Sequence, residues 1–501
     1  MADPAHSRRH YLLAVGLIFA AAAFLRFHQI DRRPFHADEG VQAYQTWRLL
    51  RGDGYTYDPA DKHGPFLYYT AAGLAKILGW TPAALSEAKL RSVTLLAGLG
   101  TLALLLGAGA RLGRAAVLVG AAIVAVSPLT VLYDTYFVQE AWFCFLTWAL
   151  FFAALRWWEQ PTLLLALLVG TLAGLMQATK ETSVLHFAAL AVPLFAFRWV
   201  SKPRGATAGG TRPPDGFSPT DKKSTRPVAG LHLLLVLLSA VAVYVVFYSA
   251  GFTRWAGVAD GLRAYFTYAA RASGGVHDHP AWYYLGILWP HSQGGVPWGE
   301  PLLLVLALVG LVLGFAPGAS HGHRSVALFT AALMTIYNFI PYKTPWLLLT
   351  PFVGLALLAG VATVRSAGWI PAKPVWLVPG LLGLLLVAEG AWRGNAALGR
   401  YANDDRNPYV YQPTSPDLPR LVAAIAAQPA GTKVAVVSPD HAWPLPWYLR
   451  DRAVTGYFAT PPGNPAAYDL ILLDSRLEAP PPSSAPAFGL RPNVLLWQVT
   501  R

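Results

Sequence analysis

Residues 11–40 read YLLAVGLIFAAAAFLRFHQIDRRPFHADEG, and this stretch decides the class of protein. The run from Tyr11 to Phe27 is apolar and is preceded by Arg8 and Arg9. An apolar run of this length can cross the hydrocarbon core of a bilayer as a helix. No small-residue cleavage site precedes the polar segment that begins at His28, as a signal peptide would require. We therefore interpret the run as an uncleaved first transmembrane span.

The composition agrees with a membrane protein. Of the 501 residues, 54% are hydrophobic and 13% are charged, whereas soluble proteins carry roughly 25% charged residues. The net charge is +13, but the 39 basic residues are scattered between apolar runs rather than clustered as in a nucleic-acid-binding surface. The single cysteine, Cys144, cannot form an internal disulfide. A polytopic membrane protein that binds no nucleic acid is the class that remains.

Ten further apolar segments are long enough, or nearly so, to span the bilayer. We therefore expect a mostly α-helical bundle of about eleven transmembrane helices. The ten segments are Leu90–Ala110, Ala115–Leu132, Glu140–Trp157, Thr162–Ala178, Thr182–Trp199, Leu231–Ala250, Glu300–Phe315, Val326–Ile340, Pro345–Val364 and Val375–Trp392.

Basic residues in alternate loops predict the orientation, because cytoplasmic loops are enriched in Lys and Arg. With the N-terminus in the cytoplasm, the loops that hold Arg114, Arg156, Arg324 and Arg365 all lie on the cytoplasmic side. The Pro-, Gly- and Ser-rich segment 200–228 is then a flexible cytoplasmic linker. The expected location is the cell membrane, meaning the inner or plasma membrane of a prokaryote.

The extracytoplasmic side receives the long first loop, residues 28–89, and everything after the last span. Within the loop, Glu39–Leu50 and Phe66–Leu78 have the pattern of helices that lie in the membrane interface. We divide the chain into a transmembrane domain, residues 1–393, and an extracytoplasmic domain, residues 394–501.

The C-terminal segment has the pattern of a small α/β domain. Leu418–Gln428 is predicted to be a helix, and Lys433–Ser438, Tyr468–Asp474 and Val494–Val499 are predicted to be strands. No glycine-rich phosphate-binding fingerprint accompanies these strands. A nucleotide site is therefore not expected there.

Two adjacent carboxylates, Asp38 and Glu39, follow the first span. They can cap the N-terminus of the interfacial helix, where the helix dipole favours anions. They can also be catalytic, because partial desolvation at the membrane surface raises the pKa of a carboxylate toward the range of a general base. Both interpretations remain open from the sequence.

Further ionisable residues lie at the extracytoplasmic ends of the predicted spans. Such residues can extend harmlessly to the interface, but ionisable groups near a membrane are also functional candidates. Lysines beside carboxylates can neutralise a phosphate while a carboxylate accepts a proton. The candidates for substrate binding are Lys62, His63, Asp134, Glu140, Lys180, Glu181, Tyr342 and Lys343.

Histidines and carboxylates of the outer loops were considered as metal ligands. The run His277-Asp278-His279 alternates ligands in a way that suits a strand better than a compact metal site. A divalent cation, Mg or Mn, bridging a phosphate is chemically reasonable, and Asp38, Glu140 or Asp134 would then hold it. The sequence makes no cofactor certain. The Gly-x-Ser-x-Gly, His-Glu-x-x-His and P-loop motifs are absent.

Taken together, these motifs resemble those of the GT-C membrane glycosyltransferases. The likeness rests on Asp38-Glu39 after one span, GPFLYY at 64–69, Ser127-Pro128 ahead of Glu140, and TKE at 179–181. Protein O-mannosyltransferases, lipid A aminoarabinose transferases and oligosaccharyltransferases belong to this superfamily. The chain is most similar to its prokaryotic flippase-activity-associated group, through HADE at 36–39, YDP at 57–59, HGP at 63–65, YKTPWL at 342–347 and WPLPWYLR at 443–450. The resemblance covers nearly the whole chain, but relatives often have an arginine where this chain has Tyr136.

The resemblance implies a glycosyltransferase, of the hexosyl or mannosyl type, that uses a polyprenyl-phosphate-linked sugar outside the cytoplasm. Asp38 matches the acidic position of the first loop and would be the general base, while Lys180 or Lys343 would balance the lipid phosphate. The acceptor would be a glycan, a lipid or a protein.

The alternative function is that of a transporter or flippase accessory without transferase activity. Transporters place ionisable groups near the bilayer midplane in related repeats, whereas this chain has no internal repeat and nearly uncharged spans. The sequence therefore favours the transferase.

Overall fold

The computed structural model of the chain describes residues 4–28, 30–59, 63–200, 230–270, 275, 277–368, 377–440, 442–452, 455–477 and 486–500. The predicted linker beyond Val200 and the candidate residue Lys62 lie outside the described residues.

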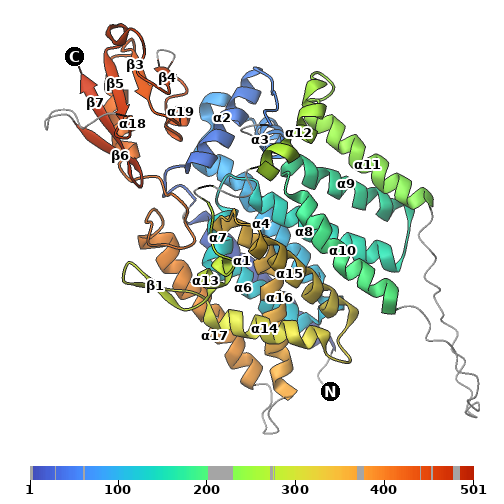
Figure 1. Cartoon of the computed structure of the whole chain (residues 1–501). Helices are drawn as coiled ribbons and strands as arrows, with labels where there is room; N and C mark the ends of the chain where they lie inside the picture. The colour runs from blue at the N-terminus through green and yellow to red at the C-terminus, as the bar shows by residue number, and fades with distance from the viewer. Residues whose placement is uncertain are drawn as a thin grey trace, which may run out of the picture.

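The described part of the chain is mainly a helical bundle with a small C-terminal sheet at one end (Figure 1). The helices and helical turns are α1 (Pro4–Phe27), α2 (Ala37–Arg51), α3 (Phe66–Ile77), η1 (Pro82–Ala84), α4 (Glu87–Gly107), α5 (Gly109–Leu112), α6 (Arg114–Val126), α7 (Pro128–Asp134), α8 (Glu140–Glu159), α9 (Leu163–Thr179), α10 (Ser183–Val200), α11 (Gly230–Tyr248), α12 (Ala256–Ala270), α13 (Tyr283–Leu288), α14 (Pro301–Phe315), α15 (His321–Phe339), η2 (Pro345–Leu348), α16 (Leu349–Arg365), η3 (Ser366–Gly368), α17 (Leu377–Asn395), η4 (Ala396–Arg400), α18 (Leu418–Ala426), α19 (Leu445–Tyr448) and η5 (Pro465–Ala467). The strands are β1 (His291–Gln293), β2 (Val296–Trp298), β3 (Val434–Val437), β4 (Thr455–Phe458), β5 (Leu470–Asp474), β6 (Ala487–Arg491) and β7 (Val494–Thr500).

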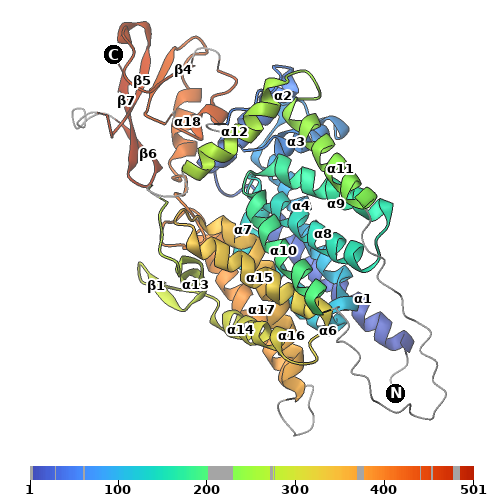
Figure 2. The same ribbon diagram turned by 45° about the vertical axis from the view of Figure 1, so that its right-hand side comes forward.

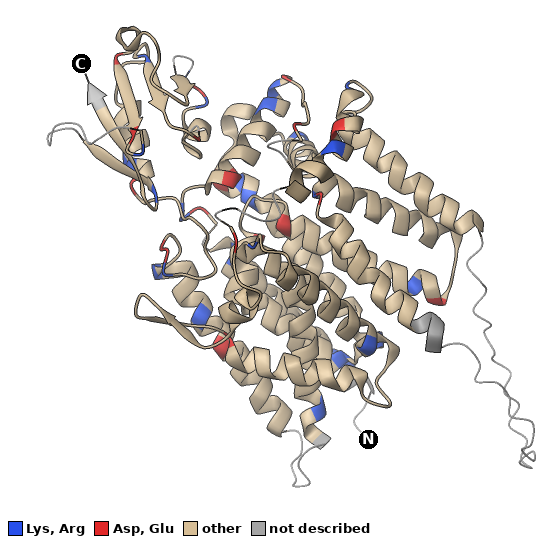
Figure 3. Ribbon diagram, viewed as in Figure 1, with Lys and Arg blue, Asp and Glu red and all other residues tan. Residues whose placement is uncertain are grey.

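Within the described residues, six helices are long and apolar enough to cross a membrane: α1, α4, α8, α11, the η2–α16 unit and α17 with η4. Helices α9, α10 and α14 are shorter but also apolar, and α15 covers the remaining expected span. The predicted span Ala115–Leu132 is not one straight helix, because α6 and α7 meet at an angle of 63°. Pro128 stands in the first turn of α7, where its fixed φ and missing N–H favour a new helix start over continuation of α6. Charged residues lie mainly toward the two ends of the bundle (Figure 3).

Helix α16 lies at the centre of the bundle, and small residues let its neighbours approach closely. A Cβ atom on Gly360 would lie 2.2 Å from the carbonyl oxygen of Ala116 in α6. A Cβ on Gly310 of α14 would lie 2.1 Å from the carbonyl oxygen of Leu358. Close backbone approach through small residues is a common way to pack helices in membranes.

The first loop forms two helices, α2 and α3, in the segments where the sequence predicted helices. Helix α2 begins with a capping box, in which the His36 side chain accepts from the backbone N–H of Asp38 and the Glu39 side chain accepts from that of His36. It ends at Gly52, whose φ of 89° is the left-handed conformation that glycine adopts without strain.

The C-terminal segment forms a five-stranded mixed sheet in the order β4-β3-β5-β7-β6. Strands β4, β3 and β5 are parallel, whereas β7 pairs antiparallel with both β5 and β6. The predicted helix and three strands correspond to α18, β3, β5 and β7. Strands β4 and β6 were not predicted.

The sheet region docks on the first loop beside α2 (Figures 1 and 2). The backbone N–H of Phe35 donates to the Tyr448 hydroxyl at 2.8 Å, and the Thr414 hydroxyl donates to the Phe35 carbonyl at 2.7 Å. Gly40 packs directly against Pro444. The C-terminal segment therefore fixes the backbone on both sides of Asp38.

Candidate functional site

A cavity of about 820 Å³ opens between α2, the start of α8, the α9–α10 junction, α12, α15 and η2. Pockets of this size hold small-molecule ligands. Six of the residues singled out in the sequence line it: Asp38, His63, Glu140, Lys180, Glu181 and Tyr342. Segments far apart in the chain thus bring these residues to one place.

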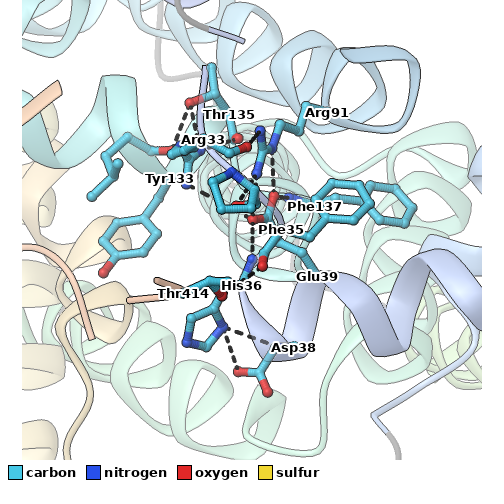
Figure 4. Close-up of polar contacts among 12 residues, drawn as sticks. Arg33, Phe35, His36, Asp38, Glu39, Arg91, Tyr133, Thr135, Phe137 and Thr414 are labelled. Carbon is cyan, nitrogen blue, oxygen red and sulfur yellow. Dashed lines mark hydrogen bonds and ion pairs between the residues drawn. The ribbon is translucent and has the colours of Figure 1, made fainter. Parts of the chain in front are cut away.

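The side chains of the adjacent residues Asp38 and Glu39 point in different directions (Figure 4). The Asp38 side chain is 50% exposed, and its Oδ2 lies 3.8 Å from Nδ1 of the His36 ring. The Glu39 side chain is fully buried and points toward Arg91. Only Asp38 of the two lines the cavity.

Glu39 is the acceptor at the centre of a buried hydrogen-bond network. Arg91 Nε donates to Oε1 at 2.7 Å and Arg91 Nη2 donates to Oε2 at 2.8 Å. The backbone N–H groups of Phe137 and His36 donate to the same two oxygens at 2.9 and 3.0 Å. Burial would raise the pKa of Glu39, but the Arg91 guanidinium outweighs it and holds the pKa below its usual value. Glu39 therefore joins α2, α4 and the segment before α8, and its position does not support the catalytic role expected from the sequence.

Lys180 and Glu140 form a buried ion pair in the cavity wall. Lys180 Nζ lies 2.5 Å from Glu140 Oε1, and both side chains are almost inaccessible. Lys180 terminates α9 in an extended conformation, with φ −157° and ψ 140°, so the chain breaks between α9 and α10 at this residue. An ammonium group has three N–H donors. Among the described residues, Lys180 Nζ donates one hydrogen bond, to Glu140. The pair thus places a cation with spare donors beside the cavity.

Glu181 orients His63 through a second buried contact. His63 Nδ1 lies 2.9 Å from Glu181 Oε2, and the Tyr57 hydroxyl donates to Glu181 Oε1 at 2.8 Å. The Tyr268 hydroxyl lies 3.1 Å from the same His63 nitrogen, and the two rings stack. Because Nδ1 faces Glu181, Nε2 is the nitrogen available to a ligand.

Besides Glu39, two more of the described candidate residues, Asp134 and Lys343, do not line the cavity. Asp134 in α7 is buried against Arg26 of α1, with 2.7 Å between Oδ2 and Nη2. Lys343 Nζ donates to the carbonyl oxygens of Ile340 and His279 at 2.5 and 3.1 Å, and burial lowers its pKa. Both expectations of substrate contact are therefore unsupported by the geometry, although Tyr342 beside Lys343 does line the cavity.

The predicted metal ligands do not assemble. The described residues contain no group of three or more His, Cys, Asp or Glu side chains arranged to hold an ion. Asp134 pairs with Arg26 and Glu140 pairs with Lys180, so neither lies free beside Asp38. His277, in the histidine run, places Nδ1 2.6 Å from the Tyr411 hydroxyl. Among the described residues, the predicted ligands Asp38, Glu140 and Asp134 therefore do not form a metal-binding cluster.

Sequence reasoning missed two sets of residues, one at the cavity and one that interacts with Asp38. Helix α12 contributes Tyr265, Phe266 and Tyr268, whose close aromatic spacing was a signal that could have found them. The C-terminal segment contributes charge and polarity near Asp38. Burial and the Asp38 carboxylate raise the pKa of Tyr411 to about 12. Burial lowers the pKa of Arg491 in β6, while the same carboxylate opposes that change. No local pattern marks these contacts.

The fold of the chain is that of solved GT-C membrane glycosyltransferases. ArnT from Cupriavidus metallidurans superposes with a TM-score of 0.64 at 14% sequence identity, over 97% of this chain and 97% of that chain, both in the apo state and bound to undecaprenyl phosphate. The oligosaccharyltransferase AglB from Archaeoglobus fulgidus, in complex with an inhibitory peptide and a dolichol-phosphate, superposes with a TM-score of 0.51 at 12% identity, over 91% of this chain and 65% of that chain. No protein-family model and no curated protein sequence matches the chain. The flippase-activity-associated group is therefore not established by these comparisons.

Proposed function

We propose that the protein is an integral-membrane glycosyltransferase that moves a sugar from a polyprenyl-phosphate donor to a hydroxyl acceptor. The observation that carries the proposal is the cavity itself, which combines the exposed Asp38 carboxylate, the Lys180 ammonium group and an aromatic wall from α12. In the same fold, ArnT has been solved with undecaprenyl phosphate. The lipid phosphate supports a lipid-linked donor here as well.

Asp38 would be the general base. The acceptor hydroxyl gives its proton to the carboxylate as its oxygen attacks the anomeric carbon. The bond between that carbon and the lipid phosphate oxygen breaks, and polyprenyl phosphate leaves with the electron pair. A base must reach the proton that it removes, and Asp38 is the accessible carboxylate of the pair in the first loop.

Lys180 would stabilise the charge that develops on the leaving phosphate. Fixed donors aimed at developing charge are usually a large contribution to catalysis in a site with little water. The bond to Glu140 holds Nζ in place and leaves it donors for phosphate oxygens. His63, oriented by Glu181, would add a donor from Nε2, and Tyr342 and the aromatic residues of α12 would contact the sugar.

The proposed arrangement in the membrane follows the distribution of Lys and Arg in the loops. The N-terminus would lie in the cytoplasm, while the loop 28–89 and the C-terminal domain, residues 394–501, would lie on the extracytoplasmic side of a prokaryotic cell membrane. Hexose or mannose would be the transferred sugar, and a glycan, lipid or protein would be the acceptor.

The test measures binding of undecaprenyl phosphate to the purified full chain in detergent. Removing Lys180 alone would leave Glu140 unpaired, so the comparison is between Glu140→Gln and the double variant Glu140→Gln/Lys180→Gln. A charge-assisted hydrogen bond contributes about 1.5–3 kcal/mol, so the double variant should bind about 10- to 100-fold more weakly than Glu140→Gln. Lys76→Gln, at an exposed position of α3, is the control and should bind like the wild type. Equal affinities of the two Glu140 variants would contradict the assignment of Lys180.

A further inference from the structure

A second cavity lies beside the end of α1, and its lining shares no residue with the cavity that holds Asp38. Its volume is about 370 Å³, which is large enough for a phosphate-bearing headgroup. The segment after α1, the end of α7 and the turn after α17 form its walls. The polar lining residues are Arg32, Arg33, Thr135, Arg400, Asn403 and Asp404. We call this cavity the arginine pocket.

The arginine pocket carries an excess of positive charge. Arg32 and Arg400 are exposed, and Arg33 is the third arginine in the lining. The one acidic residue among the described lining residues is Asp404, and Arg406 already neutralises it through bonds of 2.9 Å from Nε and 2.6 Å from Nη2. These hydrogen bonds from Arg406 hold the pKa of Asp404 below its usual value. Three arginines therefore line the pocket, and the one acidic residue in its described lining is already paired with Arg406.

Arg33 is held rigidly in the pocket wall. Its side chain is 6% exposed, Nη2 donates to the Thr135 carbonyl oxygen at 2.5 Å, and the guanidinium lies 3.8 Å from the centre of the Tyr136 ring. Its acidic neighbour is Glu39, 3.9 Å from Nη1, but Glu39 is already doubly bonded to Arg91. Burial and the Arg91 charge lower the pKa of Arg33, although Glu39 opposes the change. A bound anion would add negative charge beside Arg33.

The other part of the pocket is apolar and lies beside exposed apolar side chains of α1. Leu25, Val131 and Leu398 line it. Next to Leu25, α1 exposes Phe24 and Phe27, which are 64% and 54% accessible. An inorganic anion gains nothing from these side chains, whereas a lipid can place its phosphate on the arginines and its chain along α1.

We propose that the arginine pocket binds the phosphate group of an anionic membrane lipid, at the same end of the bundle as the larger cavity. Guanidinium groups match phosphate oxygens in geometry as well as in charge. The pocket is separate from the cavity of Asp38, with which it shares no lining residue.

The experiment titrates phosphatidylglycerol into the full chain purified in a neutral detergent. Arg32→Gln/Arg400→Gln is the test variant, because both residues are exposed and their loss should not disturb folding. Arg420→Gln is the matched control, since Arg420 is an exposed arginine of α18 outside the pocket. We expect the test variant to bind phosphatidylglycerol at least about 10-fold more weakly than the wild type. The control should be unchanged.

Inorganic phosphate separates the two sources of the phosphate group. At equal concentration it should fail to displace phosphatidylglycerol from the wild type, because it lacks the apolar chain. Displacement by inorganic phosphate would overturn the assignment to a lipid. Equal affinity of the test variant and the wild type for phosphatidylglycerol would overturn the pocket as the binding site.

Discussion

Substituting Glu39 with glutamine tests whether the buried member of the carboxylate pair holds the fold together. The carboxylate and the Arg91 guanidinium are both fully buried, and they share two hydrogen bonds of 2.7 and 2.8 Å. The carboxylate oxygens also accept from the backbone N–H groups of His36 and Phe137. Glutamine has nearly the same shape, but one of its two terminal groups donates instead of accepting. In Glu39→Gln, an NH₂ group would therefore face N–H donors.

The magnitude follows from the charges that are left behind. Removing one partner of a buried ion pair typically costs about 3–5 kcal/mol, because the other charge stays buried without compensation. Here Arg91 would lose its partner, and Arg33 would lose the carboxylate 3.9 Å from its Nη1. We expect Glu39→Gln to lower the free energy of unfolding by about 3–5 kcal/mol.

The assay is thermal unfolding of the purified chain in detergent, followed by tryptophan fluorescence. Asp38→Asn is the matched control, because Asp38 is the adjacent carboxylate at the same helix N-terminus and is half exposed. A charge at a helix terminus contributes about 0.3–1 kcal/mol, so the control should melt close to the wild type. The double variant Glu39→Gln/Arg91→Met should recover part of the loss, since both buried charges are then absent. A Glu39→Gln variant as stable as Asp38→Asn would refute this reasoning.

Two further predictions concern contacts of the C-terminal segment, one with the first loop and one with His277. Gly40→Ala would place a Cβ 2.6 Å from Pro444 Cβ, so this overpacking should destabilise the protein by about 1–3 kcal/mol and speed proteolytic release of the C-terminal segment. The control is Gly73→Ala, whose Cβ would have no atom within 4 Å and which should not change the rate of release. Equal proteolysis of the two variants would contradict the docking. Burial lowers the pKa of His277, although the Asp38 carboxylate opposes the change. The unfolded chain then binds more protons below about pH 6.5, so stability should fall as the pH decreases from that value. His277→Gln should flatten this dependence in melting curves, and an unchanged slope would show that other groups cause it.

Local sequence patterns predicted most of the bundle. Hydropathy located the helices because a helix that crosses a bilayer must be apolar along its length. The break between α6 and α7 follows from Pro128, yet the apolar run continues across it, so hydropathy alone joined the two helices. Strands β4 and β6 were missed because they are mostly only partly buried, without the strong apolar pattern of β3.

The candidate site was predictable only in part. Glu140 and Lys180 were selected because they lie at the ends of predicted transmembrane spans. In the structure they form an ion pair although they are 40 residues apart. The same criterion selected Asp134, whose partner Arg26 lies 108 residues away and could not be inferred from spacing. The capping box from His36 to Glu39 was a local signal that Glu39 would turn inward. Its partner Arg91 lies 52 residues further along the chain, beyond any local pattern.

The most direct test of the proposed function is sugar transfer by wild type and Asp38→Asn. The purified chain is incubated with radiolabelled undecaprenyl-phosphate monosaccharides, and membrane extract supplies the acceptors. The wild type should move the label from the lipid to an acceptor. General-base catalysis contributes about 10²- to 10⁴-fold, so Asp38→Asn should slow transfer by that factor while it binds undecaprenyl phosphate and melts like the wild type. Transfer at the wild-type rate by Asp38→Asn would remove this residue from the mechanism, and a wild type that transfers no sugar would contradict the proposed function.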